Sequence, residues 1–311
     1  MPRLLIFTLL LFTIACTPGS RQDNINASDE SPKTIKLQLN PQIGKKYKYL
    51  VTSETESSQE IGGEEIKNNS NVEMNVEYLF QRDSMKNLLV DLTYTKFSLH
   101  VKMGEIEKEL NAATAATSFD PSEKMFAAFN NANLYAVVDT LGNVLSLRGI
   151  DVIKGKMRQL AAGNANATDM LNSTMQQYLG EEFFRQTIEK SFKMLSDKPL
   201  SAGDTISQTN TLNAGFPITV QTIYKVDAIK NNMAEIVSDA AINMKEQQMT
   251  VEGSDVLATL KGDQTGKIEM DAVTGILKSS DSDFKLKGNL QVAGNNVPVK
   301  IRVRNKVLLV N

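Results

Sequence analysis

Side chains suited to nucleophilic catalysis are scarce in this sequence of 311 residues, which contains one histidine and one cysteine. His100 falls between Leu99 and Val101 in an alternating run, so we expect it on the exposed, polar side of a strand. Ser-His-Asp and Cys-His catalysis then lack a group, and zinc sites built from histidine and cysteine ligands are excluded. We predict no enzymatic activity, no cofactor and no metal.

Carboxylates and a glycine-containing stretch suggest two other kinds of site. Asp263, Asp281 and Asp283 could offer oxygen ligands to Ca²⁺ near turns, but the ligand order of a calcium-binding loop is missing. Residues 262–267 (GDQTGK) have one residue too few between the glycines for a phosphate loop, and Ile268 replaces the required serine or threonine. We interpret the acidic residues as solvated turns and 262–267 as a hairpin. A hydrolase that uses carboxylates alone is a third alternative.

The first sixteen residues have the features of an export signal. Arg3 gives a positive start, and the apolar run from 4 to 15 is too short to span a membrane. Residues 13–16 (TIAC) resemble a bacterial lipobox, in which the cysteine is lipidated on sulfur, although Thr13 departs from the usual leucine. Because Cys16 is the only cysteine, no disulfide can form within the chain. We predict lipid attachment at Cys16; ordinary signal cleavage nearby is the alternative.

Composition separates a tether from a folded domain. Residues 17–33 carry almost no large apolar side chain and cannot repay the entropy cost of ordering. We therefore divide the chain into a lipoprotein signal peptide (1–16), a flexible tether (17–33) and a single β-rich domain (34–311). A net charge of -2 and the absence of tryptophan argue against nucleic acid as a partner. A membrane, reached through the lipid anchor, is the expected partner.

Alternation of apolar residues with a period of two predicts strands in both halves of the domain. The first strand is expected at 34–40, and a shift of phase at 95–96 indicates a β-bulge that curves the sheet. Residues 269–277 mirror 137–145 around an Asp-to-Gly turn, and similar matches recur in the same order. The two halves are either a duplicated β unit or hairpins that are alike by chance.

Between the halves, residues 150–195 are the only stretch with sustained helical periodicity. Apolar residues recur there at spacings of three and four, while charged residues occupy the other side, which indicates amphipathic helix. Phe184, Ile188 and Phe192 lie on the apolar side and either seal the core or line a cavity for an apolar ligand. The helical segment is thus either a cap on a sheet or a lid over a cavity.

These elements predict an α+β fold that is mainly β. We expect a large curved antiparallel sheet shaped like a half-barrel, with a central helical segment (149–197) packed on it. The β units would be 34–148 and 198–311, whether or not they arose by duplication.

The layout from about Leu37 to Val310 resembles an uncharacterised family of Gram-negative lipoproteins. The resemblance rests on strand starts and turns: Gly44-Lys-Lys-Tyr, Asp139 to Gly142, Gly203-Asp-Thr and Asp271 to Gly275. It implies no catalytic residues, because the family has no assigned activity. The architecture is also similar to periplasmic lipoprotein-carrier half-barrels, whose concave face holds acyl chains.

Two functions follow. The first is a non-enzymatic binding module for a hydrophobic ligand such as a lipid or acyl chain; the alternative is a structural or interaction scaffold of the cell envelope with a filled core. The 13 methionines suit irregular apolar ligands but fill cores as readily. The resemblance implies a lipid-anchored protein of the outer membrane that faces the periplasm.

Overall fold

The computed structural model describes residues 34–82, 87–162, 181–190, 195–213, 217–251, 254–292 and 294–310. The predicted signal peptide, Cys16 and the tether lie outside the described residues, as do Phe192 and the middle of the predicted helical segment. Among the helices that the structure describes, none is long and apolar enough to cross a membrane.

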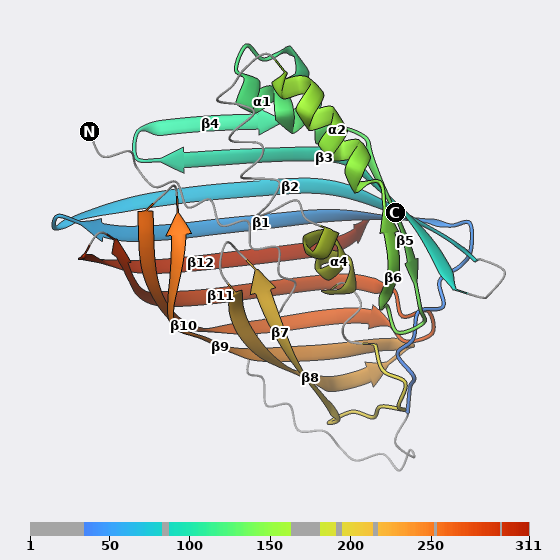
Figure 1. The fold of residues 1–311 in the computed structure, drawn as a ribbon. Helices are drawn as coiled ribbons and strands as arrows, with labels where there is room; N and C mark the ends of the chain where they lie inside the picture. Colours follow the sequence, from blue (N-terminus) through green and yellow to red (C-terminus); the bar gives the residue numbers. More distant parts are fainter. Residues whose placement is uncertain are drawn as a thin grey trace.

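One antiparallel sheet of twelve strands forms the body of the domain (Figure 1). Its order is β6-β5-β3-β2-β1-β12-β11-β10-β9-β8-β7, and β4 pairs with β3. The predicted mainly β fold with a large antiparallel sheet is confirmed. The strands are β1 (Lys46–Ile61), β2 (Glu64–Arg82), β3 (Leu88–Met103), β4 (Ile106–Asn111), β5 (Ala132–Val138), β6 (Val144–Arg148), β7 (Thr205–Asn213), β8 (Pro217–Lys230), β9 (Met233–Val251), β10 (Ser254–Asp271), β11 (Leu277–Val292) and β12 (Asn295–Val310).

Both halves of the sheet follow the same chain order. Strands β1, β2, β3, β5 and β6 form one meander, β7 to β11 form a second, and β12 joins them. The two turns matched in the sequence are also alike. Asp139 accepts a hydrogen bond from the N–H of Leu141 at 2.9 Å, and Asp271 accepts one from the N–H of Val273 at 3.0 Å. Each aspartate thus fixes the turn that follows it.

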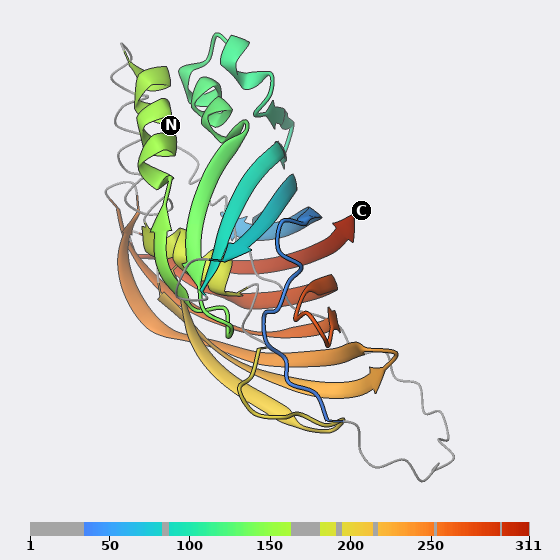
Figure 2. The same ribbon diagram turned by 90° about the vertical axis from the view of Figure 1, so that its right-hand side faces the viewer.

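The sheet is strongly curved (Figure 2). The β2–β3 register slips between Asn75 and Val76, which confirms the predicted bulge at 95–96. At Gly262 and Gly288, a Cβ atom would lie 1.9 Å from a backbone oxygen of the neighbouring strand. Glycine is required there because the strands approach too closely for any side chain.

Short helices lie at one end and on the concave side of the sheet. They are η1 (Ala115–Thr117), α1 (Pro121–Phe126), η2 (Ala127–Phe129), α2 (Ile150–Ala161) and α4 (Glu181–Lys190). Helix α2 buries Ile150, Ile153, Met157 and Ala161, whose spacing of three and four residues places them on one side. Both α2 and α4 fall inside the segment predicted to be helical.

The predicted strand at 34–40 is wrong. Ile35 forms an isolated bridge with Leu200, and the backbone then runs along the two matched turns. The N–H of Leu39 donates to the carbonyl of Thr140 at 2.8 Å, and the N–H of Asn40 donates to that of Thr274 at 2.8 Å. Alternating leucines can therefore fill the end of a sheet without joining its ladder.

The turns predicted around the acidic residues are also wrong. Asp263 and the 262–267 stretch lie inside β10, while Asp281 and Asp283 lie inside β11. The three aspartates occupy polar positions of long strands whose other face is apolar. Glycine and aspartate are usual in turns, but here the closely approaching strands and an outward-facing row of charges explain them.

Candidate functional site: the concave face

Alternate residues of each strand face the concave side, and most are apolar. They form two clusters of buried side chains. The first joins β1, β2, β3 and β5 to the helices, and it also takes in the parts of β8 to β12 nearest them. The second lies further along the sheet and comprises Val220, Ala240, Ile242, Met244, Val256, Ala258, Leu260, Phe284, Leu286, Leu290, Val299 and Val303.

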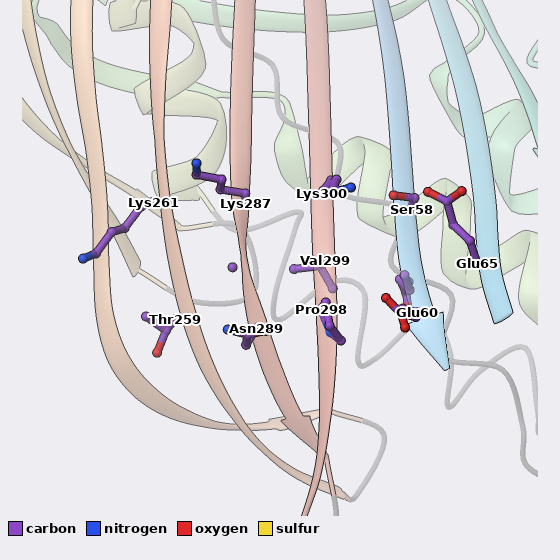
Figure 3. A pocket seen from close by; sticks show the side chains of 12 residues that line it. Ser58, Glu60, Glu65, Thr259, Lys261, Lys287, Asn289, Pro298, Val299 and Lys300 are labelled. Atoms are coloured by element: carbon purple, nitrogen blue, oxygen red, sulfur yellow. The ribbon is translucent and has the colours of Figure 1, made fainter. Parts of the chain in front are cut away.

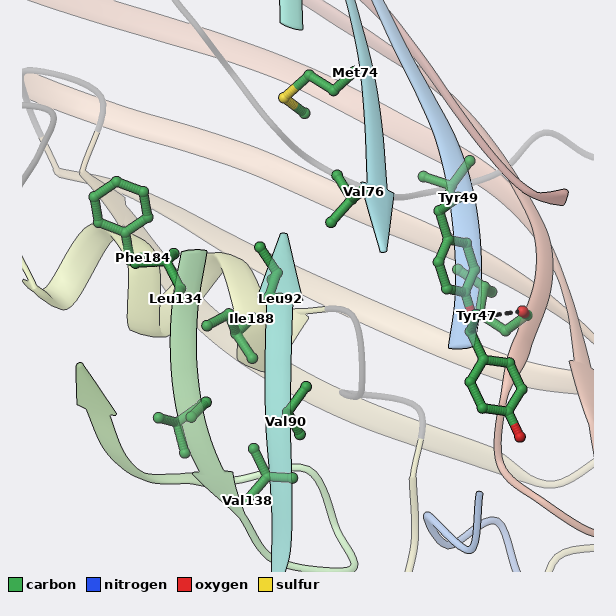
Figure 4. Close-up of a cluster of buried hydrophobic side chains, with 14 of the residues drawn as sticks. Tyr47, Tyr49, Met74, Val76, Val90, Leu92, Leu134, Val138, Phe184 and Ile188 are labelled. Carbon is green, nitrogen blue, oxygen red and sulfur yellow. Dashed lines mark hydrogen bonds between the residues drawn. The ribbon is translucent and has the colours of Figure 1, made fainter. Parts of the chain in front are cut away.

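Helix α4 closes part of the first cluster. The side chains of Phe184 and Ile188 are only 4% and 3% exposed, and they belong to the first cluster together with Leu92 and Leu134 (Figure 4). Polar bonds hold the helix on the edge strand β6. The N–H of Val144 donates to the carboxylate of Glu189 at 3.0 Å, and Arg185 donates to the carbonyl of Val144. The apolar side of α4 therefore faces the sheet. Phe192, the third residue predicted to line this region, lies outside the described residues.

The second cluster has a different surrounding. The helices in the described ranges pack mainly against one another, against β4 and against β6. A sheet with one apolar face requires a second layer to remove that face from water. Helices supply that layer beside β6, and the side chains of the second cluster are also buried, at 0–7% exposure.

A band of buried, uncharged polar side chains separates the two clusters. Strand register places Ser53, Asn305, Ser282 and Ser238 in one row that crosses β1, β12, β11 and β9, with Gly266 of β10 between the last two. The two adjacent rows add three more. Together they are all the buried serine, threonine, asparagine and glutamine side chains in the described part of the chain: Ser53, Thr222, Ser238, Gln264, Ser280, Ser282 and Asn305.

Two serines of this row differ in their hydrogen bonds although both are 1% exposed. The hydroxyl of Ser282 donates to the carbonyl of Asn305 at 3.3 Å. The hydroxyl of Ser238 has no hydrogen-bond partner within the described residues. A buried hydroxyl without a partner costs free energy, which a polar group of a bound molecule could recover.

Two tyrosines of the first cluster stay neutral. Burial raises the pKa of Tyr49 and of Tyr94 above the usual tyrosine range. Tyr49 donates a hydrogen bond to the carbonyl of Leu277 at 3.0 Å, so its hydroxyl is satisfied. The concave face therefore has neutral hydrogen-bonding groups between its two apolar clusters. It suits a molecule that is uncharged where it meets the polar band.

The residues first considered for catalysis lie elsewhere. His100 is on the outward face of β3, 46% exposed, and its Nε2 lies 2.9 Å from a carboxylate oxygen of Glu107. Its predicted surface position is confirmed. No group of three histidine, cysteine, aspartate or glutamate side chains in the described ranges could hold a metal ion.

The sequence analysis missed the polar band. Its signal was present, since Ser280 and Ser282 share the phase of Phe284, and Ser238 stands between Ile236 and Ala240. Small polar residues at inward positions of apolar strands mark such a band. Their alignment into one row depends on the register between strands that are distant in sequence.

Comparison with known proteins identifies a family and a few distant structures. A family of unknown function (DUF6263) matches residues 85–277, and no curated protein matches the chain. A structure titled "Lipid-protein interactions in lipovitellin" is 14% identical, with a TM-score of 0.49, and covers 87% of this chain. This chain spans only 25% of the lipovitellin chain.

Two other structures are less similar. DynF from the dynemicin biosynthesis pathway of Micromonospora chersina is 6% identical over 95% of both chains, with a TM-score of 0.23. An outer membrane channel from Pseudomonas putida F1 is 9% identical over 92% of this chain and all (100%) of that one, with a TM-score of 0.19. Likenesses at these scores carry no argument about function. The family match does not show that its members are Gram-negative lipoproteins, and that part of the resemblance stays a prediction.

Proposed function

This chain belongs to the DUF6263 family, whose function is unknown, and we propose from its own geometry that it is a non-enzymatic binding module of the cell envelope. Its ligand is hydrophobic, a lipid or acyl chain, and lies on the concave face of the sheet. Lipid on Cys16 anchors the protein in the outer membrane, facing the periplasm. The anchor and the location rest on the sequence of residues 1–16 and on the resemblance described above.

The observation that supports the proposal is the division of the concave face into two apolar clusters by a neutral polar band. An ordinary core has little use for a row of buried hydroxyls and amides, because each one costs desolvation. The concave face runs from one apolar cluster across the polar band to the other apolar cluster. A lipid with apolar chains on both sides of an ester or amide group has the same order of apolar and polar parts. Its chains would pack on the two apolar clusters, and its polar group would lie beside Ser238.

A filled-core scaffold is the alternative, favoured by the tight packing of Phe184 and Ile188 against the first cluster. Truncation of Phe184 separates the two functions. In a filled core, Phe184→Ala removes packing and leaves a cavity, at a cost of about 3–5 kcal/mol. If the side chain covers a ligand site, less packing is lost, and the cost falls to about 1–2 kcal/mol while ligand binding changes.

The test measures binding of a fluorescent acyl-ester probe and thermal unfolding on the same samples. Cys16→Ser protein, which should leave the membrane, avoids detergent that would compete for the probe. Phe97→Ala is the matched control, because Phe97 is buried in the same cluster but stacks on Phe126 at 4.6 Å, in the α1 region. We expect saturable probe binding that Phe184→Ala weakens and Phe97→Ala leaves unchanged. Absence of probe binding, together with a large loss of stability in Phe184→Ala, would support the scaffold.

A further inference from the structure

The outward face of the sheet carries rows of charged side chains, and in some rows every charge has an opposite charge next to it. Asp263 faces Lys285, Lys285 faces Arg302, and Arg302 faces Glu56 across four strands. Arg302 also binds Asp283 through two hydrogen bonds of 2.8 Å. In such rows each charge finds an opposite charge beside it, as expected for a stable sheet surface.

A row of three lysines has no such opposite charges between its strands. Lys261 of β10 faces Lys287 of β11, and Lys287 faces Lys300 of β12. All three side chains are exposed, and none forms an ion pair within the described part of the chain. Like charges directly opposite one another destabilise a sheet. The row therefore lowers stability in the free protein, and a bound anion would relieve the repulsion.

The row lies in a groove formed by two overlapping hollows of about 730 and 690 Å³. Figure 3 shows the three lysines on neighbouring strands, with Thr259 and Asn289 beside the row. These two residues add a hydroxyl and an amide that can donate hydrogen bonds to an anion. Lysine ammonium groups bind phosphate as point charges, so the groove has both the charge and the donors that phosphate requires.

We propose that this groove binds a narrow anion with two or more phosphate groups, laid across the strands along the lysine row. Neighbouring strands lie about 4.8 Å apart, so successive ammonium groups can meet successive phosphates of a linear ligand. Glu60, Glu65 and Asp263 flank the row. They would repel a broad anionic surface such as a membrane, but a narrow ligand in the row passes between them. The net charge of -2 likewise gives a membrane no general attraction.

Titration of the full chain in non-ionic detergent with inorganic triphosphate, followed by calorimetry, tests the proposal. We expect saturable binding that weakens as salt is added, and that Lys287→Gln weakens by about fivefold or more. Lys306→Gln is the matched control, since Lys306 is an exposed lysine on the same face of β12 but faces Asp281. It should leave the affinity unchanged.

Thermal unfolding without triphosphate shows whether the variants fold, and Lys287→Gln should then melt no lower than the wild type, because repulsion is removed. The proposal is overturned if triphosphate shows no saturable binding or if both variants weaken it equally. It is also overturned if vesicles containing anionic lipid bind through these lysines while triphosphate does not.

Discussion

Replacement of Ser238 by alanine should make the free protein more stable, contrary to the usual effect of a substitution in a buried site. Its hydroxyl is 1% exposed and has no hydrogen-bond partner among the described residues. An unsatisfied buried polar group costs about 1–3 kcal/mol, and alanine removes that group while leaving a void of one oxygen atom. We expect Ser238→Ala to raise the free energy of unfolding by about 1 kcal/mol.

Ser282→Ala gives a control that matches in residue type, row and burial. It removes the hydrogen bond to the carbonyl of Asn305 and should lower the free energy of unfolding by about 1 kcal/mol. Urea unfolding of protein stripped of lipid measures the free energy of unfolding of both variants, and thermal unfolding measures their melting temperatures. In a domain of this size the two melting temperatures should move in opposite directions by about 2–4 °C.

The same two variants test the role of the band in binding. Ser238→Ala should weaken binding of an acyl-ester probe, because it deletes the hydroxyl available to the polar group of the ligand. It should leave the binding of a plain alkane probe unchanged. If Ser238→Ala destabilises the stripped protein as much as Ser282→Ala, the hydroxyl has no free hydrogen-bonding capacity and the reasoning is refuted.

Four further predictions concern single residues. Gly275→Ala should lower the free energy of unfolding in urea by more than about 2 kcal/mol, because φ of Gly275 is +65° and a Cβ there would lie 2.3 Å from a backbone oxygen. Gly44 has a φ of +78° but lies in open space, so Gly44→Ala should cost only about 1 kcal/mol. Asp283→Asn should lower stability at pH 7 by about 1–2 kcal/mol, because the Arg302 guanidinium holds the pKa of Asp283 below its usual range. A depressed pKa adds stability above the unfolded value of about 4, and this stability is lost as pH falls through the folded value. The difference in unfolding free energy between variant and wild type should therefore shrink as unfolding is measured at successively lower pH. Tyr49→Phe should cost about 1–2 kcal/mol in thermal unfolding, because the carbonyl of Leu277 loses its donor, and an unchanged melting temperature would contradict this. Cys16→Ser should move the protein from the membrane to the soluble fraction and remove acyl mass; continued membrane binding with unchanged mass would exclude lipid attachment at Cys16.

The sequence predicted where the strands and helices lie better than it predicted which segments they pack against. Long alternating runs such as 220–226 and 234–244 indicate strands because one face must be buried, and the bulge at 95–96 appears as a change of phase. The same alternation misled at Leu37 and Leu39, which fill the end of the sheet beside two turns. Periodicity reports which side of a segment is buried but not what buries it.

The candidate sites depended on register, which single-sequence patterns do not contain. Ser238 and Ser282 are 44 positions apart, and they share a row because β10 lies between their strands. Lys261, Lys287 and Lys300 look like ordinary surface lysines until pairing places them side by side. Phe184 and Ile188 were identified from helical spacing alone, because that pattern is local. A site whose residues come from several strands can be recognised only once the register of those strands is known.

Native mass spectrometry of the full chain, extracted gently from its own membrane, tests the central claim most directly. A bound lipid should add mass in the native spectrum and leave in the denatured one, whereas lipid on Cys16 should remain covalently attached in both. We predict a released lipid that carries a neutral ester or amide group, at reduced occupancy in Ser238→Ala and unchanged occupancy in Phe97→Ala. Native and denatured masses that agree, in protein that also fails to take up an acyl-ester probe, would contradict the account.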